Sequence, residues 1–491
     1  MGQLAQSWTS GFQSPRPSLL NSSRELLQGI ITLKHMAVNS LENTAPWTRH
    51  SFDANESFGV DPFVLADYYF VPFKAAIQDG GARGIMCSYN AVLGKPTCLS
   101  PLIRNAREQW GFEGYVTSDS DSVQNAWSNH HYPPPDPTAL KATALALKEG
   151  QCDINSGDTY NKNLKLALAL KTEGLKMADV DRALFNSFKQ RFDLGLFDPK
   201  AAYAWPTADD VGTDASAALS LQASQESIVL LRNDQNLLPL KKGKRIAVLG
   251  PHANAQKVLV QPYPFSPFCP DKTLDCIKSP AAALAELNDG PAGEQWTRSA
   301  AGCDLFFNNK TGFAEALALA KEADYVILGL GIETCGMDPA HNLNPKAHGG
   351  KIGTCYQEAL TTGYVFPDQY LELEAHDRTS IDLPAIQHEF AAAVLALNKP
   401  TVIFLLNAGS VAIDAEAAAR KEAGAAPLAI IEAFCAWVTY LCSLLPPPSL
   451  YLCVSLLVLF FIYLNGAPLR LTALALAHAV VKNSLLTDFA L

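Results

Sequence analysis

The alternation of short apolar runs with amphipathic segments constrains the fold of this chain more than any other feature. The first half of the sequence has four such runs, at residues 30–33, 84–88, 115–118 and 152–155. Segments with helical periodicity, such as 67–78 and 137–148, lie between them. A strand, polar residues at its end and then a helix form the repeat of a parallel α/β domain. In a (β/α) barrel, the active-site residues lie at the carboxyl ends of the strands. The polar residues at those positions here are Lys34, His35, Tyr89, Asn90 and Asp119.

A second α/β unit follows a linker that we expect at residues 192–215, where Gly, Pro and Asp occur with little periodicity. We expect a helix near 383–398 and strands at 227–232, 245–250, 324–331 and 400–406. These strands are almost uniformly apolar, which indicates a sheet covered on both faces. The glycine after RIAVL lacks the GxGxxG pattern and a phosphate-binding lysine, so we interpret it as a tight turn.

Composition excludes several classes of protein. The chain has 491 residues, 48% of them hydrophobic, and its 31 glycines and 31 prolines follow no period. It is therefore globular, not disordered, collagen-like or a coiled coil, and its length suits two to four domains of about 150 residues. With 38 basic and 48 acidic side chains the net charge is −10, which argues against a nucleic-acid partner.

The C-terminal tail differs in kind from the rest of the sequence. No basic residue occurs between Lys421 and Arg470, and residues 449–464 are almost entirely apolar. This segment is shorter than the roughly 20 residues needed to cross a bilayer, and prolines at 446–448 break any extension toward the N-terminus. Two interpretations stay open: a short membrane anchor, or sequence that was not selected to fold as part of this protein.

The cysteines and glycosylation sequons are typical of an extracellular protein. None of the 11 cysteines forms a CxxC pair, so a zinc or thioredoxin-type site is not indicated. Before the tail, the closest pairs are compatible with short disulfide loops: Cys87 with Cys98 and Cys269 with Cys276. Sequons stand at Asn21, Asn55 and Asn309. We expect an extracellular or secretory location, although the N-terminus shows no signal-peptide pattern.

Taken one at a time, the candidate chemical residues have ordinary explanations. Asp119 follows the run YVTS, where a carboxylate can serve as a nucleophile or base, but a loop aspartate also caps helices. The pair Lys34 and His35 is equally compatible with surface polarity. Glu372 and Glu374 precede HDRTSIDLP, which suits a solvated loop.

Together, five segments in order resemble the family 3 glycoside hydrolases. They are LKHMAVNSLEN, GIMCSYNAVLGKPTC, GFEGYVTSDSDSV, CDINSGDTY and EAHDRTSIDLPAIQ. The resemblance implies a (β/α) barrel followed by an α/β sandwich, with the active site in the cleft between them. The MCSYN and SD-x-D-x-V motifs are similar to the β-xylosidase and α-arabinofuranosidase branch. The resemblance runs from about residue 27 to about residue 434. It implies a partial (β/α)8 barrel at 1–200, an α/β sandwich at 201–434 and an unmatched hydrophobic tail at 435–491.

The resemblance also implies the catalytic residues. The family retains anomeric configuration by means of two carboxyl groups, which stand about 5–5.5 Å apart in retaining enzymes. The matching position makes Asp119 the nucleophile. The family's Glu-x-Glu before an Asp-Arg pair places the general acid/base on Glu372, with Glu374 as the alternative. Domain closure and the charge of Asp119 would raise the pKa of the acid/base. No metal or organic cofactor is implied.

Sugar-binding roles carry over in the same way. Lys34 and His35 resemble the family's KH pair, which hydrogen-bonds sugar hydroxyls. Arg49 resembles the basic residue that supports that pair and the nucleophile. Tyr89 resembles the tyrosine beside the nucleophile, and Met86 is expected to line the same pocket. Cationic donors suit a polyol, and an aromatic face stacks on sugar C–H groups.

The sequence departs from the family pattern near the active site. Early barrel strands are missing before Lys34, so we expect roughly half a barrel, which would expose a sheet edge. Ser120 and Ser156 stand where the branch usually has cysteines. This indicates an absent disulfide and leaves Cys87 and Cys98 as the expected pair.

Two further departures lie in the second half of the chain. Residues 334–369 resemble an insertion, and a disulfide between its Cys335 and Cys355 would help hold Glu372 in place. The match ends abruptly at Cys435, which favours a mispredicted exon or retained intron over a membrane anchor.

The function expected from the sequence is that of a retaining, exo-acting glycoside hydrolase. Its substrates would be β-linked plant-type oligosaccharides, from whose non-reducing ends it would release xylose or a related sugar. The alternatives are a catalytically degenerate carbohydrate-binding fragment of the same fold, a β-glucosidase, and a membrane-tethered protein. The sequence does not choose among xylose, arabinose and glucose.

Overall fold

A computed structural model describes most of the chain as two compact units, which divide near residue 205. The described residues are 1–21, 23–202, 207–259, 276–289, 296–306, 308–332, 377–407 and 409–434. Glu372, Glu374, Cys269, Cys335, Cys355 and the tail from Cys435 lie outside them.

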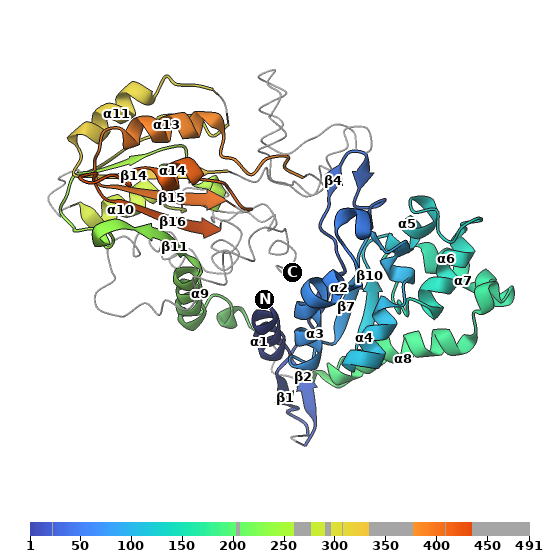
Figure 1. Ribbon diagram of the computed structural model, residues 1–491. Helices are drawn as coiled ribbons and strands as arrows, with labels where there is room; N and C mark the ends of the chain where they lie inside the picture. The colour runs from blue at the N-terminus through green and yellow to red at the C-terminus, as the bar shows by residue number, and fades with distance from the viewer. Residues whose placement is uncertain are drawn as a thin grey trace. The chain divides into compact units, whose positions relative to one another are not determined.

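The first unit contains a parallel sheet in the order β10-β7-β3 (Figure 1). Its strands are β3 (Thr32–Met36), β7 (Gly84–Cys87) and β10 (Tyr115–Ser118). A fourth segment adds to the same edge, because Ile154 forms a parallel bridge with Thr117. The four predicted apolar runs are therefore confirmed as neighbours in one parallel arrangement. The first strand, predicted at 30–33, lies at Thr32–Met36.

Helices and short strands complete the first unit. The predicted helix at 67–78 is α3 (Phe70–Gln78), entered through a π turn at Leu65–Tyr69. The predicted helix at 137–148 is α6 (Ala139–Lys148), whose first turn is capped by the Thr138 side chain. The other helices are α1 (Gly2–Gln13), α2 (Pro62–Val64), α4 (Leu102–Trp110), α5 (Ser122–Ser128), α7 (Thr159–Ala169) and α8 (Met177–Asp193).

Three small sheets lie outside the central one. They are β1 (Pro15–Pro17) with β2 (Glu25–Leu27), β4 (Asn43–Thr44) with β5 (Trp47–Thr48), and β6 (Asp53–Ala54) with β8 (Ala91–Val92) and β9 (Lys95–Pro96). The core lies between the central strands and their helices: Leu33, Ile85 and Val116 on the strands are buried in one cluster with Phe73 and Ile103.

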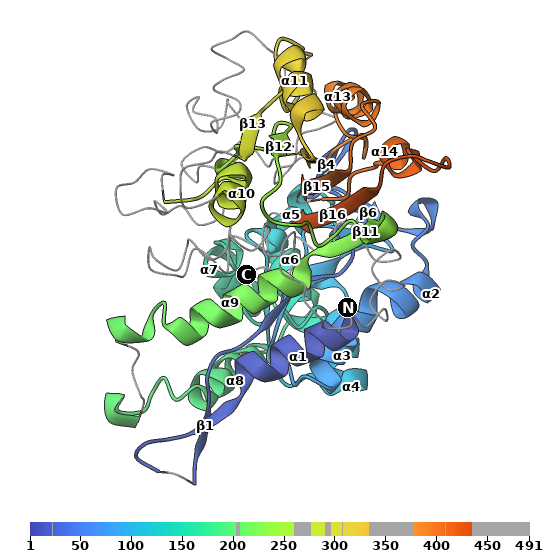
Figure 2. The ribbon, with the colours of Figure 1, turned by 90° about the vertical axis from the view of Figure 1, so that its left-hand side faces the viewer.

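The second unit is built on a larger sheet in the order β11-β16-β15-β14-β12-β13 (Figure 2). Its strands are β11 (Val229–Asn233), β12 (Ile246–Leu249), β13 (Thr297–Ala300), β14 (Tyr325–Gly331), β15 (Thr401–Asn407) and β16 (Leu428–Phe434). All neighbouring pairs are parallel except β11 with β16, which are antiparallel. The four expected strands and the expected helix, α13 (Ala385–Leu395), are present.

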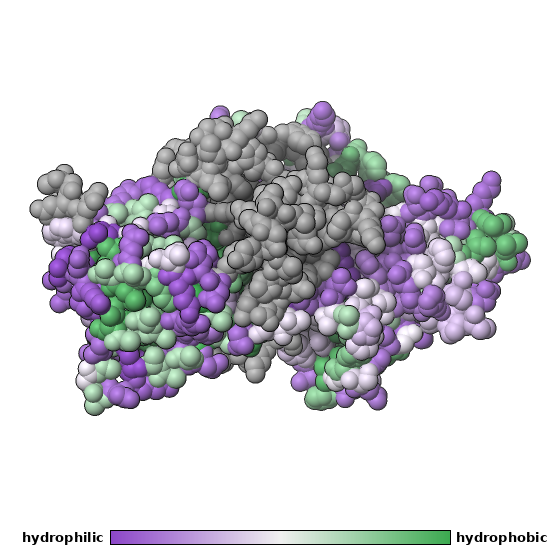
Figure 3. Space-filling view, turned by 90° about the horizontal axis from the view of Figure 1, so that it is seen from above, coloured by the Kyte–Doolittle hydropathy of each residue, from purple (hydrophilic) through white to green (hydrophobic). Residues whose placement is uncertain are grey.

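Helices cover both faces of this sheet, as its uniformly apolar strands predict. Ile246 and Val248 of β12 are buried in the cluster that contains α10 (Pro280–Asn288). Ala247 and Leu249 are buried in the opposite cluster, which contains α13 and α11 (Phe313–Glu322). Figure 1 shows α10 on one side of the strands and α11 and α13 on the other. Seen from above, the surface of the second unit mixes hydrophilic and hydrophobic residues (Figure 3).

The second unit begins with α9 (Asp214–Ser227), where the predicted linker ends, and contains α14 (Asp414–Ala418) between β15 and β16. Gly250, after β12, has a φ of +100°, and a Cβ there would lie 2.2 Å from the Gly329 carbonyl oxygen. Its role is therefore a tight turn with close backbone approach, in agreement with the interpretation from sequence.

The cysteine prediction can be checked in part. Cys87 and Cys98 form a disulfide with a Cα–Cα distance of 5.2 Å, as expected. Cys276 is also disulfide-bonded, whereas its predicted partner Cys269 lies outside the described residues. Among the described residues, no helix has the length and apolar character needed to span a membrane, and the apolar segment 449–464 is not among them.

Candidate active site

Asp119 stands at the carboxyl end of β10, at the edge where the parallel strands of the first unit place their polar residues. Its backbone N–H donates to the Cys87 carbonyl oxygen at 3.1 Å, which ties it to the end of β7. Its own carbonyl accepts a hydrogen bond from the Ser122 N–H at 3.0 Å, where α5 begins. The strand end and the helix start therefore fix the backbone of Asp119 on both sides.

Three groups hold the Asp119 carboxylate. His35 Nε2 lies 3.2 Å from Oδ2, the Ser120 N–H donates to Oδ1 at 2.6 Å, and the Tyr89 side chain makes a further hydrogen bond. The Asp119 side chain is 15% exposed, so the carboxylate is sheltered but accessible. The structure thus joins three of the residues predicted from sequence: Asp119, His35 and Tyr89.

Burial and hydrogen bonding act in opposite directions on the pKa of Asp119. Burial raises it, because desolvation disfavours the charged form. The hydrogen bond and charge of His35, the Ser120 N–H and the Tyr89 hydroxyl lower it. The lowering contributions win, so the pKa of Asp119 lies below its ordinary value and the carboxylate is ionised at neutral pH.

His35 is oriented from its other side by Asn39. The Asn39 amide nitrogen lies 3.3 Å from His35 Nδ1, and an amide nitrogen can only donate. With Nδ1 accepting, the proton of a neutral His35 ring is on Nε2 and points at Asp119. Lys34 is the half-buried neighbour of His35 on β3, and its ammonium group has no ion pair with another described residue.

Tyr89 is enclosed by cationic and aromatic side chains. The Arg49 guanidinium lies 5.0 Å from the centre of its ring, and the His50 ring meets it edge-on at 4.5 Å. His130 Nε2 lies 2.9 Å from the Tyr89 backbone carbonyl oxygen, to which it donates. These contacts fix both ends of Tyr89, so its hydroxyl reaches Asp119 from a set position.

Two more predicted residues, Arg49 and Met86, are described, whereas Glu372 and Glu374 lie outside the described residues. Arg49 forms an ion pair with Glu42 at 3.0 Å, with both side chains about one-fifth to one-quarter exposed. This pair places a charge beside Tyr89. Met86 is half-buried on β7, immediately before Cys87.

His50 and His130 were not predicted from the sequence. Burial lowers the pKa of both, and the nearby charge of Arg49 further lowers that of His50. Both rings are therefore neutral at neutral pH and act as hydrogen-bonding and packing groups. His50 lies in the segment RHSF and His130 in the segment NHHY. The hydropathy pattern of neither segment differs from that of an ordinary surface loop, so the sequence carried no signal for them.

The two serines that replace family cysteines lie in segments that meet. The Asp121 N–H, directly after Ser120, donates to the Ser156 carbonyl oxygen at 2.6 Å. Gly157 allows this approach, because its φ is +137° and a Cβ there would lie 2.0 Å from Asp121 Oδ1.

The chemistry open to this site is that of an ionised, partly shielded carboxylate. Such a group can attack an electrophilic carbon or accept a proton, and the donors around it suit a hydroxyl-rich ligand.

Two family models match the chain. The Glycosyl hydrolase family 3 N terminal domain matches residues 55–185, and the Glycosyl hydrolase family 3 C-terminal domain matches residues 228–434. This chain belongs to glycosyl hydrolase family 3. The family assignment made from motifs is confirmed, together with an N-terminal domain followed by a C-terminal α/β sandwich domain.

The similar curated proteins have β-xylosidase names. Probable beta-D-xylosidase 7 of Arabidopsis thaliana is 33% identical over 424 residues, which is 84% of this chain and 47% of the relative. Probable exo-1,4-beta-xylosidase bxlB of Aspergillus clavatus is 30% identical, over 82% of this chain and 48% of the relative. The chain thus spans about half the length of the relatives that it matches.

Solved structures show the same fold at lower identity. A GH3 exo-β-xylosidase in complex with a xylobiose aziridine probe has a TM-score of 0.66 and 24% identity, over 93% of this chain and 50% of that one. A β-glucosidase from Listeria innocua in complex with isofagomine has a TM-score of 0.64 and 22% identity, over 88% of this chain and 51% of that one.

Proposed function

We propose that this protein is a retaining, exo-acting glycoside hydrolase that releases xylose or a related sugar from the non-reducing ends of β-linked oligosaccharides. The observation that carries the proposal is the Asp119 carboxylate, kept ionised by His35, Tyr89 and the Ser120 N–H at the end of β10. The β-xylosidase names of the relatives support the choice of sugar.

In the first step, Asp119 attacks the anomeric carbon of the terminal sugar. A carbon–oxygen bond forms to the carboxylate while the glycosidic bond breaks, and the leaving oxygen takes a proton from the acid/base. Each carboxylate oxygen accepts up to about two hydrogen bonds, so the donors on Oδ1 and Oδ2 leave a lone pair for attack. We propose Glu372 as the acid/base and Glu374 as the alternative, on the motif alone.

In the second step, the acid/base takes a proton from a water molecule, which attacks the same carbon and releases Asp119 as a carboxylate. This double displacement returns the sugar with its original configuration. The low pKa of Asp119 favours its role as the leaving group in this step, because a stabler carboxylate leaves more readily.

The sugar-binding roles are divided among the predicted residues. Lys34 is proposed to donate to sugar hydroxyls. Both His35 ring nitrogens already have protein partners, so we propose that His35 chiefly holds the nucleophile in place. Arg49 and Tyr89 would shape the sugar-facing wall, and Met86 would add apolar contact beside them.

We further propose that residues 1–200 derive from a (β/α) barrel and that residues 201–434 supply the acid/base. The proposed location is extracellular, in keeping with the Cys87–Cys98 disulfide.

The test is hydrolysis of an aryl β-xyloside by the full chain. Asp119→Asn removes the nucleophile but keeps the side-chain shape, so kcat/KM should fall by about a thousandfold or more. Asp158→Asn is the matched control, because Asp158 is in the same unit and its side chain is 66% exposed; it should keep its activity.

Aryl β-glucoside and aryl α-arabinofuranoside assays decide the sugar. Faster hydrolysis of the glucoside would make the protein a β-glucosidase. A thermal shift with xylose but no hydrolysis of any aryl glycoside would replace the enzyme with a carbohydrate-binding protein of the same fold.

A further inference from the structure

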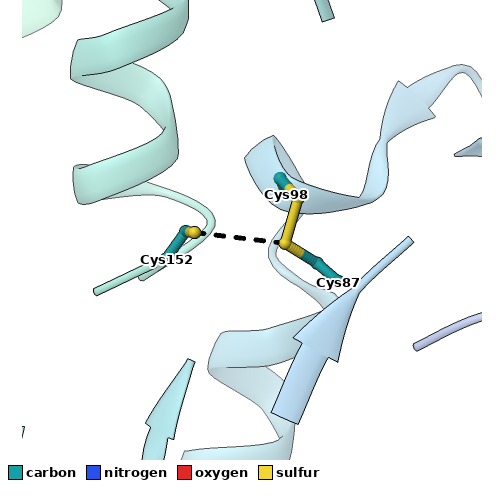
Figure 4. Close-up of side chains that lie close together, drawn as sticks. All are labelled: Cys87, Cys98 and Cys152. Carbon is teal, nitrogen blue, oxygen red and sulfur yellow. Dashed lines mark hydrogen bonds between the residues drawn. A yellow bond between two sulfur atoms is a disulfide. The ribbon is translucent and has the colours of Figure 1, made fainter. Parts of the chain in front are cut away.

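Three buried sulfur atoms lie together beside the candidate site (Figure 4). Cys87 ends β7 and is disulfide-bonded to Cys98 in the short helix η3 (Thr97–Leu99), while Cys152 is a free, buried thiol. Cys152 Sγ lies 4.0 Å from Cys87 Sγ, and the three sulfur atoms all lie within 4.8 Å of one another. Because two of them are already joined, the group offers one thiol and not a three-thiolate metal site.

The backbone packing, rather than the rotamer of one side chain, brings Cys152 to the disulfide. Gly150 allows the segment before Cys152 to contact η3, since a Cβ at Gly150 would lie 1.9 Å from the Cys98 carbonyl oxygen. On the other side, Ile154 bridges Thr117 of β10, the strand that pairs with β7. The segment is therefore fixed between η3, which carries Cys98, and β10, the strand that pairs with β7.

The contact has a defined direction. A disulfide sulfur carries no hydrogen, so in the contact between Cys152 and Cys87 only Cys152 can donate. The Cys152 thiol also lies 3.3 Å from the Ile154 carbonyl oxygen. After it loses this proton, Cys152 becomes a nucleophile that already faces a disulfide sulfur.

We propose that Cys152 is a second disulfide partner of Cys87, so that Cys87, Cys98 and Cys152 form one thiol–disulfide exchange centre. The Cys152 thiolate attacks Cys87 Sγ, and the Cys87–Cys152 bond forms as the Cys87–Cys98 bond breaks. The electron pair leaves on Cys98, which takes up the proton that Cys152 gave away. The step consumes no oxidant or reductant and leaves the number of free thiols unchanged.

Exchange alters the segment that carries Tyr89. The disulfide of the described form closes a loop with a sequence separation of 11, and Tyr89 lies within that loop. The alternative disulfide joins residues 65 positions apart and leaves the Tyr89 segment untethered at Cys98. A disulfide that closes a longer loop removes more conformational entropy from the unfolded chain. This entropy effect therefore favours the Cys87–Cys152 bond over the Cys87–Cys98 bond.

The rate of exchange depends on how readily Cys152 ionises. Burial raises the pKa of Cys152 to about 12, and the neighbouring charge of Asp153 acts in the same direction. Hydrogen bonding with Tyr160 and with the Ile154 backbone, together with the charge of Arg107, opposes this. Because the thiolate is the attacking species, exchange should be slow at neutral pH and speed up about tenfold per pH unit below that pKa.

Peptide mapping of the full chain tests the proposal. Oxidised protein is held at about pH 7 and about pH 9, quenched with acid, alkylated and digested without reduction. The cross-link should move from Cys87–Cys98 to Cys87–Cys152, while the alkyl label moves from Cys152 to Cys98 in equal amount. The change should be about a hundredfold faster at the higher pH.

Two serine variants serve as controls. Cys152→Ser should abolish the alternative cross-link. Cys303→Ser should leave exchange unchanged, because Cys303 is the other free buried cysteine among the described residues and belongs to the second unit. A label that stays on Cys152 at the higher pH, including in mild urea, would overturn the proposal. A map with Cys87 and Cys98 both free would also overturn it. The wild-type map decides the question even if Cys152→Ser fails to fold.

Discussion

At the scale of single residues, the chemistry of the site depends on which of two opposing effects wins at Asp119. Burial alone would raise its pKa, and three hydrogen-bond donors more than offset this. Among those donors His35 contributes most, through both its hydrogen bond and its charge. The ionisation of Asp119 therefore depends most on one neighbouring ring, which Asn39 orients.

Replacing His35 tests this balance. His35→Ala removes the largest lowering contribution, so the pKa of Asp119 should rise. The acidic limb of the kcat/KM–pH profile for an aryl β-xyloside should then move to higher pH. His35→Gln keeps a donor without the charge and should give a smaller shift. An acidic limb that does not move in His35→Ala would assign the ionisation of Asp119 to its other donors.

At the scale of secondary-structure elements, one buried carboxylate joins several parts of the first unit. Asp153 accepts from Arg107 of α4 at 2.6 Å, from the Val116 N–H of β10 at 2.9 Å and from Asn186 of α8 at 3.0 Å. Burial raises the pKa of Asp153 to about 6 against the opposing charge of Arg107. Burying the Asp153–Arg107 ion pair therefore costs free energy. Removing one partner costs more, because the other charge then stays buried without its counter-charge.

Truncation of one partner should reveal that cost. Asp153→Ala leaves the Arg107 guanidinium buried without its counter-charge, so the free energy of unfolding should fall by about 3–5 kcal/mol in urea titration. Asp158→Ala removes one partner of an exposed pair with Lys162 in the same unit and should cost less than about 1 kcal/mol. Equal losses in the two variants would show that the buried pair does not hold these elements together.

At the scale of the whole molecule, the chain divides into two units. Asp119, the proposed nucleophile, belongs to the first unit, and Glu372, the proposed acid/base, belongs to the second part of the chain. The proposed reaction therefore needs both. The proposed secretory location can be tested on the same full chain, because the three sequons differ in accessibility. Asn21 and Asn309 are exposed, whereas Asn55 is half-buried and its amide nitrogen donates to Asp53 at 3.0 Å.

Expression through a eukaryotic secretory pathway should place glycans on Asn21 and Asn309 but not on Asn55. Enzymatic deglycosylation followed by mass spectrometry would count and locate them. Asn21→Gln and Asn309→Gln should each remove one glycan. A glycan on Asn55 with Asn21 and Asn309 bare would contradict the accessibility argument.

The sequence by itself determined most strands of the two main sheets, the helices α3, α6 and α13, and the family. Apolar runs and helical periodicity report the local backbone and its burial, so β7, β10 and β14 fall where they were predicted. The strand-end position of Asp119 was also predicted from sequence and is confirmed, whereas its role as the nucleophile stays a prediction. The pattern did not reveal β13 or β16, or that β11 runs antiparallel to β16.

The tertiary structure alone decided which side chains meet. His50 and His130 reach Tyr89, and Cys152 reaches the Cys87–Cys98 disulfide, from segments that are distant in sequence. Periodicity carries no information about such contacts, since they depend on how strands register and how loops return to the sheet edge. The same packing decides the pKa of Asp119, because desolvation and hydrogen bonding are properties of the folded surroundings and not of the residue.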